Sequence, residues 1–332
     1  MSARKKPLVV VTRKLPDSVE TRMRELFDAR LNLDDEPMSQ DQLADAVRTA
    51  EVLVPTVTDH ISADILNQPD CKLRMIANFG NGVDNIDVAA AVARGITVTN
   101  TPKVLTEDTA DMTMALILAV PRRLIEGASI LTEGKNWAGW SPTWMLGHRI
   151  GGKRLGIIGM GRIGQGIARR GAFGFGMDVI YHNRSRLSPE LEADCKARYV
   201  GKEELLRSAD HVVLVVPYSA ASHHTIGAPE LGLMKPTATL INIARGGIVD
   251  DAALAVALRE RRIAAAGLDV FEGEPKVHPD LLTVPNVVLT PHIASATIKT
   301  RRAMADLAAD NLIGYLVHGK PLTPLNPAVL AT

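Results

Sequence analysis

Cysteine, net charge and long hydrophobic runs are all scarce in this sequence of 332 residues. Its two cysteines, Cys71 and Cys195, are too few and too far apart for a disulfide framework, and they suit a reducing cytoplasm. The net charge of +1 gives no electrostatic basis for binding nucleic acid or an anionic membrane. The most apolar internal stretch, Met114–Val120, is much too short to span a bilayer. We therefore expect a cytoplasmic protein without a membrane segment.

The hydrophobic share of 46% is sufficient for a large core, and the length suggests two domains. Short apolar runs alternate with helical patterns along the chain, which is typical of parallel sheets covered by helices. Strands are expected at Leu8–Thr12, Val52–Pro55, Met75–Asn78, Thr97–Thr99, Leu155–Ile158, Asp178–His182, His211–Val216, Thr239–Ile243, Ala265–Asp269 and Val287–Thr290. Helices are expected at Val19–Leu26, Gln40–Thr49, Val88–Arg94, Glu107–Arg123, Lys202–Ser208, Asp250–Arg262 and Lys299–His318.

One glycine motif lies between a predicted strand and a predicted helix. Gly159, Gly161 and Gly164 form G-x-G-x-x-G directly after the apolar run Leu155–Ile158. Gly159 permits a tight turn, Gly161 lets the backbone approach a pyrophosphate, and Gly164 lets helix and strand pack closely. The pyrophosphate is then expected at the helix N-terminus, where Arg162 is suited to a phosphate contact. The motif predicts a Rossmann domain that binds a dinucleotide.

A carboxylate is missing from the end of the following strand. Sites for NAD usually present an acid there to the ribose 2′-hydroxyl, but this chain continues after His182 with Asn-Arg-Ser-Arg. A carboxylate would repel a 2′-phosphate, whereas the guanidinium of Arg184 offers a planar fork of donors that pairs with phosphate bidentately. We therefore predict NADP(H) rather than NAD(H), with contacts at Asn183, Arg184 and Ser185.

Three polar side chains follow strands in the second half of the chain. Arg245 comes after Leu240–Ala244, Glu274 lies in the loop after Leu268–Val270, and His292 follows Leu289–Pro291. Ligands of open α/β sheets bind beyond the carboxyl ends of the strands. Hydride addition to a carbonyl leaves an alkoxide that needs a proton, and histidine is suited to supply it near neutral pH. We hypothesise that Glu274 keeps His292 charged as the acid, while Arg245 holds a substrate carboxylate and polarises the carbonyl.

Four stretches in this order, GMGRIG, INIARGGIVDDAAL, GLDVFEGEP and LTPHIASAT, resemble the D-isomer-specific 2-hydroxyacid dehydrogenases over nearly the whole chain. The resemblance implies that Arg245, Glu274 and His292 are catalytic, which agrees with the hypothesis from the residues themselves. It also implies that Asp269 approaches the nicotinamide carboxamide and that Pro217 lies beside the adenosine half of the cofactor. The expected cofactor contacts are completed by Ile163 and Ile243.

The same resemblance implies where the substrate binds. Residues 78–84, NFGNGVD, correspond to a substrate-domain loop whose backbone amides at Asn81 and Gly82 would bind the substrate carboxylate. Val54 is expected to line the same pocket. The catalytic Arg245 and His292 complete the expected substrate contacts.

Within the family, the segment Thr101–Arg123 and the loop WAGWSPTWMLG are most similar to glyoxylate and hydroxypyruvate reductases, whose cofactor is commonly NADPH. In that subgroup a Trp at the position of Trp144 reaches across a two-fold interface and covers the substrate pocket of the neighbouring subunit. The resemblance therefore implies a homodimer in which Trp144 contributes to the partner's site.

These observations predict an α/β protein of two Rossmann-like, doubly wound parallel-sheet domains with a cleft between them. Residues 1–100 with 296–332 are expected to form a flavodoxin-like substrate-binding domain, and residues 101–295 an NADP-binding Rossmann domain. The predicted reaction is NADPH-dependent reduction of glyoxylate to glycolate and of hydroxypyruvate to D-glycerate, with His292 as general acid. Two alternatives stay open: another D-2-hydroxyacid, formate or phosphonate-type dehydrogenase, and a non-catalytic interaction protein that senses the cofactor.

The adjacent histidines His223 and His224 are expected to lie in a solvated loop. Neighbouring residues point in different directions in any regular element, and no Cys or acid stands near them at metal-ligand spacing. We therefore predict no metal site in this protein.

Overall fold

The computed structural model describes residues 6–135 and 137–331 of the chain. The chain divides into two compact units, one formed by Met1–Leu105 with Ala296–Thr332 and the other by Thr106–Ser295. The boundary between them lies before Thr106, where a helix begins, whereas the expected domain boundary follows residue 100. Each unit contains one parallel β-sheet with helices packed on it, so the predicted α/β class is confirmed.

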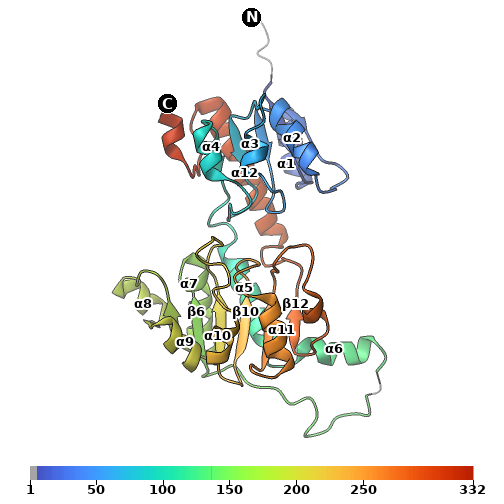
Figure 1. The fold of residues 1–332 in the computed structure, drawn as a ribbon, viewed down its shortest axis with the longest axis vertical. Coiled ribbons are helices and arrows are strands. Elements are labelled where there is room, and N and C mark those ends of the chain that lie inside the picture. Colours follow the sequence, from blue (N-terminus) through green and yellow to red (C-terminus); the bar gives the residue numbers. More distant parts are fainter. Residues whose placement is uncertain (1–5, 136, 332) are drawn as a thin grey trace, which may run out of the picture. The chain divides into compact units, whose positions relative to one another are not determined.

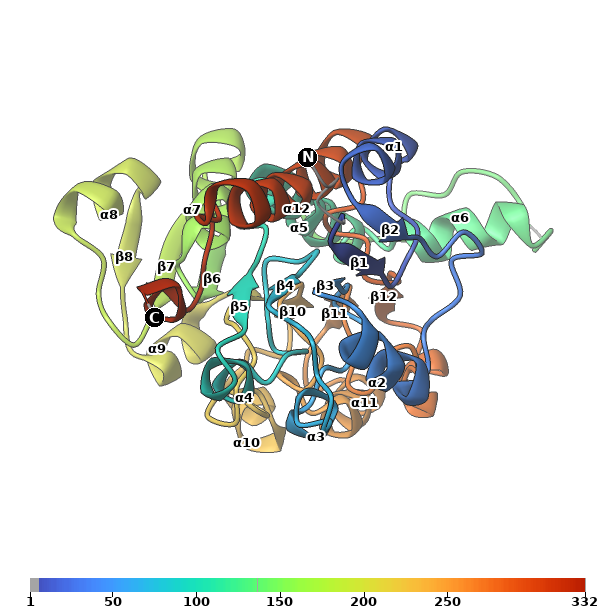
Figure 2. The ribbon, with the colours of Figure 1, turned by 90° about the horizontal axis from the view of Figure 1, so that it is seen from above.

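The first unit contains a five-stranded parallel sheet in the order β2-β1-β3-β4-β5, which is a doubly wound order. Its strands are β1 Leu8–Val11, β2 Asp28–Arg30, β3 Val52–Val54, β4 Met75–Ala77 and β5 Thr97–Thr99. Its helices are α1 Asp17–Leu26, α2 Gln40–Thr49, α3 Ala63–Leu66, α4 Val88–Ala93 and α12 Ile298–His318, followed by the short η3 Pro327–Ala331. Figure 2 shows α1 and α12 on one face of this sheet and α2, α3 and α4 on the other.

Local side-chain chemistry explains where the helices of the first unit begin. Ser39 caps α2 in a capping box with Gln42, and Asp87 accepts a hydrogen bond from the backbone N–H of Ala90 at the start of α4. The C-terminal segment is held to β5 by Asn326, which accepts from the N–H of Val98 (2.9 Å) and donates to the carbonyl of Ile96 (2.8 Å). These bonds fix the end of the chain in the first unit.

The second unit contains a seven-stranded parallel sheet in the order β12-β11-β10-β9-β6-β7-β8. Its strands are β6 Arg154–Ile158, β7 Asp178–His182, β8 Ala197–Tyr199, β9 His211–Leu214, β10 Thr239–Asn242, β11 Ala265–Leu268 and β12 Val287–Leu289. The chain builds the sheet outward from β6 through β7 to β8, and then crosses back to β9 on the other side of β6. This reversal is a topological switch point, so the loops beyond the carboxyl ends of β6 and β9 are the expected place for a ligand.

Both faces of the second sheet are buried, which explains the continuous apolar runs in the sequence. Leu155, Ile157 and Val213 point to the face covered by α5 Thr106–Ala119 and α7 Arg162–Arg169, whereas Val212 and Leu214 point to the opposite face. The remaining helical segments of the unit are α6 Leu124–Thr132, η1 Arg170–Gly174, α8 Pro189–Cys195, α9 Lys202–Ser208, α10 Ala228–Leu233, α11 Asp251–Arg259 and η2 Pro279–Leu282.

The helix expected over Glu107–Arg123 stops before Pro121, so that prediction is wrong at its C-terminal end. Helix α5 ends at Ala119, and Arg123 takes a left-handed backbone conformation (φ +53°) immediately before α6. The guanidinium of Arg123 pairs with Glu126 in the first turn of α6 (2.6 Å), so it begins a helix instead of ending one. Helix α6 has no buried residue, and Figure 1 shows it extending away from the seven-stranded sheet.

Across residues 6–135 and 137–331, the structure contains no helix that is both long and apolar enough to cross a membrane. Cys71 and Cys195 are both free thiols.

The close packing of α7 on β6 depends on Gly164. A Cβ at this position would fall on the carbonyl oxygen of Gly159, in the turn between β6 and α7. We expect Gly164→Ala to lower the free energy of unfolding by about 1–3 kcal/mol, because the helix must shift away from the strand. Gly232→Ala is the matched control: Gly232 also lies in a helix, but its added Cβ would meet no atom within 4 Å. Urea denaturation of both variants checks this, and equal stability would contradict the packing role.

Candidate active site

Each of the three glycines in and beside the turn after β6 has a different physical role. Gly159 has a positive φ (+105°), and a Cβ there would lie 2.5 Å from the carbonyl oxygen of Val215, after β9. Gly164 allows the helix to approach the turn, as described above. A Cβ on Gly161 would meet no atom within 4 Å, so open space lies beside the N-terminus of α7. This space is where a pyrophosphate would approach the backbone N–H groups, and the residues present fit that group.

Asn183 holds the glycine turn in place. Its side-chain oxygen accepts a hydrogen bond from the N–H of Met160 (2.7 Å), which links the end of β7 to the turn. Its carbonyl accepts from the hydroxyl of Tyr199 (3.3 Å). The side chain expected to contact the cofactor therefore has a structural bond of its own.

Arg184 and Arg186 have different environments although they are two residues apart. Arg186 forms a bidentate pair with Glu192 through Nε (2.9 Å) and Nη2 (2.8 Å). Hydrogen bonds from Arg186 and from the hydroxyl of Tyr181 (2.7 Å) lower the pKa of Glu192 to about 2. Arg184 is exposed, and no carboxylate in the part of the chain that the structure describes pairs with it. Arg184 is thus the arginine that is available to an incoming anion.

The three residues predicted to be catalytic follow three adjacent strands of the second sheet. Arg245 follows β10, Glu274 follows β11 and His292 follows β12, at the carboxyl ends of the strands. Nδ1 of His292 lies 2.8 Å from Oε2 of Glu274, and both side chains are about a quarter to a third exposed (30% and 26%). The sequence-based pairing of these two residues is therefore present in the structure, and it leaves Nε2 of His292 for a substrate.

Glu274 is held as an ionised partner for His292. Burial raises the pKa of Glu274, but the hydrogen bond and charge of His292, the backbone N–H of Phe271 (2.9 Å) and the positive charge of Arg245 together bring it below its ordinary value. A carboxylate at this position favours the imidazolium form of the histidine.

Asp269 holds the loop that carries His292. Its carboxylate is fully buried and accepts from the hydroxyl of Thr290 (2.7 Å) and from the N–H groups of Ile293 and Ala294 (both 2.8 Å). The N–H of His292 donates to the carbonyl of Asp269 (2.8 Å), and His292 has a positive φ of +53°. The expected approach of Asp269 to the nicotinamide stays a prediction, and the role visible in the structure is to position His292.

The loop of Arg245 lies directly against the loop of Glu274. A Cβ on Gly246 would fall on the carbonyl oxygen of Phe271, so only glycine permits this contact. The side chain of Asn242 stabilises the turn that contains Arg245 by donating a hydrogen bond to the carbonyl of Arg245 (3.0 Å). These contacts bring the guanidinium near the Glu274 carboxylate.

The other predicted site residues are distributed as follows. Arg162 and Ile163 begin α7, and Pro217 and Ile243 follow β9 and β10 at the same edge of the sheet. Val54, Asn81 and Gly82 belong to the first unit. There Val54 is fully buried, and the carbonyls of Asn81 and Gly82 accept from the side chains of Asn100 (2.7 Å) and Asn78 (2.8 Å). Their contacts with a substrate stay predictions.

Trp144 lies in the second unit, in the exposed loop after α6. Its ring stacks on that of Trp137 with 6.5 Å between the centroids, and the whole residue is 45% exposed. Leu124, Ile125 and Leu131 on α6 are also more than half exposed. An apolar surface of this kind is typical of a protein interface.

Sequence reasoning missed Glu192 and the holding role of Asp269. Glu192 lies on α8, a helix that was not expected, and nothing in the local sequence distinguishes its contact with Arg186. Asp269 could have been suspected, because a carboxylate at the end of a buried strand must find hydrogen-bond donors nearby.

Comparison with known proteins agrees with this geometry. Residues 114–294 match the model of the D-isomer specific 2-hydroxyacid dehydrogenase NAD binding domain. A glyoxylate reductase of Thermococcus onnurineus is 45% identical over 98% of this chain and 97% of its own length. A glyoxylate reductase of Aeropyrum pernix is also 45% identical, over 98% of both chains.

Solved structures of known reductases are also similar to this chain. An NADPH-dependent glyoxylate/hydroxypyruvate reductase of Sinorhizobium meliloti, in complex with NADP and malonate, is 36% identical, with a TM-score of 0.84 and 97% of each chain covered. A glyoxylate reductase of Paecilomyes thermophila is 31% identical, with a TM-score of 0.85 over 97% of this chain and 99% of that one. With its glycine turn and its adjacent arginine, glutamate and histidine loops, the chain belongs to the D-isomer specific 2-hydroxyacid dehydrogenase family.

Proposed function

We propose that this protein is an NADPH-dependent reductase of small 2-keto acids, which converts glyoxylate to glycolate and hydroxypyruvate to D-glycerate. The observation that carries the proposal is the contact of His292 with the ionised Glu274, with Arg245 on the adjacent loop. The names of the relatives in the Thermococcus, Aeropyrum and Sinorhizobium species support the choice of substrates.

In the proposed reaction, the reduced nicotinamide supplies a hydride to the carbonyl carbon. His292 donates a proton from Nε2 to the carbonyl oxygen as negative charge develops on it, so the alkoxide is neutralised as it forms. Glu274 stabilises the protonated imidazole before transfer, through its bond to Nδ1. Arg245 pairs with the substrate carboxylate and polarises the carbonyl. One keto acid, one hydride and one proton give one hydroxy acid.

The preference for NADPH is proposed from Arg184. Its guanidinium is exposed beyond the end of β7, whereas Arg186 is neutralised by Glu192. A free guanidinium at this position favours a 2′-phosphate. We propose that the second unit, Thr106–Ser295, binds the cofactor and that the first unit binds the substrate through Asn81 and Gly82.

We also propose a homodimer located in the cytoplasm. The exposed apolar side chains of α6 and the tryptophan loop support an interface between two copies, with Trp144 covering the partner's substrate pocket. The two free thiols support a reducing compartment.

The first experiment is the steady-state oxidation of NADPH and NADH with glyoxylate, hydroxypyruvate and pyruvate, followed by the absorbance of the reduced nicotinamide. NADPH oxidation that is fastest with the first two acids supports the whole proposal. A preference for NADH would overturn the proposed role of Arg184, but it would leave the proposed roles of Arg245, Glu274 and His292 unaffected. Absence of turnover, with NADPH bound, would favour another substrate or a cofactor-sensing role.

Removal of Arg184 tests the cofactor preference. We expect Arg184→Ala to lower kcat/KM for NADPH by about 10- to 100-fold, because a charge-assisted phosphate contact contributes roughly 1.5–3 kcal/mol. The value for NADH should change little, because NADH has no 2′-phosphate. Arg186→Ala, which removes an arginine already paired with Glu192, is the control and should have a smaller effect. Equal losses for both cofactors would exclude recognition of the 2′-phosphate.

Removal of the Glu274 charge tests the proposed role of His292 as general acid. The pKa of Glu274 lies below its ordinary value of 4.5, so this carboxylate is ionised at every pH from mildly acidic upward. In Glu274→Gln the imidazolium of His292 loses its partner, so reduction should fall at least about tenfold, and further at about pH 8 than at about pH 6. The pH profile of kcat/KM measures this, with the surface variant Glu203→Gln as control. A uniform loss at every pH would contradict charge stabilisation.

Removal of Trp144 tests the cross-subunit contact. We expect Trp144→Ala to raise KM for hydroxypyruvate several-fold with little change in kcat, because a wall of the partner's pocket is lost. Trp140, which is 84% exposed in the same loop, gives the control variant Trp140→Ala. Sedimentation analysis of both variants checks that the dimer persists. Unchanged kinetics in an intact Trp144→Ala dimer would exclude this contact.

A further inference from the structure

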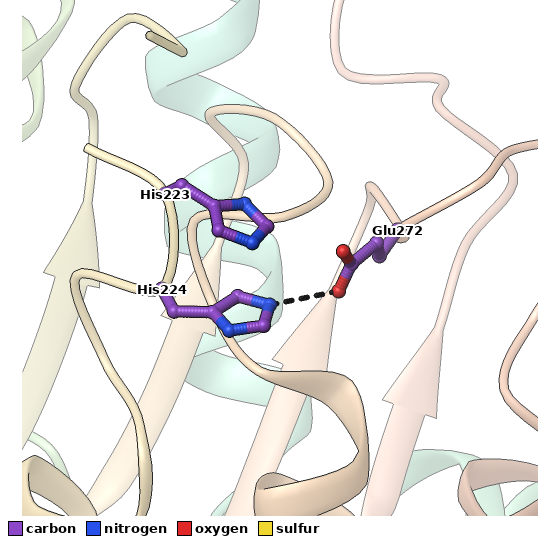
Figure 3. A group of neighbouring side chains, drawn as sticks. All are labelled: His223, His224 and Glu272. Atoms are coloured by element: carbon purple, nitrogen blue, oxygen red, sulfur yellow. Dashed lines mark hydrogen bonds and ion pairs between the residues drawn. The ribbon is translucent and has the colours of Figure 1, made fainter. Parts of the chain in front are cut away.

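His223, His224 and Glu272 form a cluster outside the catalytic residues. Figure 3 shows the two imidazole rings side by side, with Glu272 facing them from another loop. One ligand atom from each residue lies within 4.8 Å of the other two. Across residues 6–135 and 137–331, this is the one group of three histidine, cysteine or acidic side chains that meets this spacing.

The backbone explains why adjacent histidines point the same way, contrary to the sequence-based expectation. His224 has a positive φ of +48°, and its N–H donates to the carbonyl of Gly247 (2.7 Å). In this conformation the rings of His223 and His224 stack with 3.8 Å between their centroids. The expectation of two diverging side chains is therefore wrong, because it assumed a regular element.

The acid partner comes from a distant part of the sequence. Glu272 follows β11, and its Oε2 lies 3.0 Å from Nε2 of His224. Its backbone N–H donates to Oδ2 of Asp251 (3.0 Å), which fixes the start of the loop. The sequence near His223 and His224 contains no acid at the spacing of a metal ligand. A cluster nevertheless forms, because the sheet brings the loop of Glu272 beside the loop of the two histidines.

The surroundings favour a cation. Tyr218 lies 3.2 Å from Nδ1 of His223, where its oxygen can accept the ring proton and leave Nε2 as a ligand. Asp250 lies 3.9 Å from Nδ1 of His224. The pocket beside the cluster is lined by three carboxylates, Asp250, Asp251 and Glu272, and by two basic side chains, Lys276 and His278.

We propose that His223, His224 and Glu272 bind a divalent transition-metal ion, with Zn²⁺ as the expected occupant. Two imidazoles and one carboxylate are typical zinc ligands, whereas Mg²⁺ and Ca²⁺ prefer oxygen ligands alone. An imidazole nitrogen binds a metal ion through a lone pair in the plane of its ring, and two stacked rings cannot both direct such a lone pair at one ion. Tetrahedral coordination with bonds of about 2.0–2.1 Å therefore requires the rings to rotate out of their stack on binding. His223 and Glu272 are exposed, which permits this rotation and leaves the fourth position to water.

This inference is independent of the proposed reaction, because binding is measured without cofactor and substrate. Chelator-treated protein that has no polyhistidine tag is titrated with ZnCl₂ by calorimetry at about pH 7.5, where histidine is mostly neutral. We expect one ion per chain, with no displacement by excess Mg²⁺. At about pH 5.5 the affinity should fall, because protonated imidazoles do not bind metal.

Four variants locate the ion. His223→Gln and Glu272→Gln should each lower the Zn²⁺ affinity by about tenfold or more, because each removes a ligand. His60→Gln changes an exposed histidine of the first unit and should leave binding unchanged. His292→Gln tests the catalytic pair as a competing site and should also retain the ion. The site is overturned by the absence of saturable binding, by full affinity in either ligand variant, or by loss in His292→Gln.

Discussion

The buried carboxylate of Asp269 makes the hydrogen bonds on which the position of His292 depends. An unpaired carboxylate in a protein interior costs several kcal/mol, and here three short hydrogen bonds from one loop compensate for the burial. Those bonds hold His292 at a positive φ, which a non-glycine residue adopts at a cost of about 1–3 kcal/mol. The same carboxylate thus fixes the strained backbone that directs the imidazole toward Glu274.

The remaining geometry follows from parallel strands with short loops. Because β10, β11 and β12 are neighbours, the loops that carry Arg245, Glu274 and His292 leave the same edge of the sheet. Gly246 lets two of these loops approach to backbone contact, so a guanidinium and a carboxylate share one small region. The charges reinforce one another, since Arg245 and His292 both favour the ionised form of Glu274.

Most of the fold could be predicted because most strands of both sheets are short apolar runs separated by clear helical patterns. The three-residue strands β2 and β8 were missed, since Asp28–Arg30 and Ala197–Tyr199 have too few apolar residues to show a period. The end of α5 was placed too late, because the expected helix ran through Pro121, although a proline disfavours the helical conformation of the residue before it. Arg245, Glu274 and His292 could be placed at one edge of the sheet because each lies in the loop that follows a predicted strand.

The pairing of Glu274 with His292 was expected from the sequence, but the partners of Arg186 and Glu272 on other segments were not. Arg184 and Arg186 look equivalent along the chain, and only the position of Glu192 on α8 makes one of them neutralised and the other available. The same holds for Glu272 and Glu274, which lie two residues apart after β11. Glu274 turns to His292 on one neighbouring loop and Glu272 to His224 on another.

Glu272 and Glu274 together hold the loop after β11 from two sides. The side chain of Glu274 bonds His292 on one side, the side chain of Glu272 bonds His224 in the loop after β9 on the other, and the backbone N–H of Glu272 donates to the buried Asp251. Burial raises the pKa of Asp251, and the nearby charges of Glu272 and Asp250 act in the same direction. A cation beside Glu272 would offset this repulsion between carboxylates.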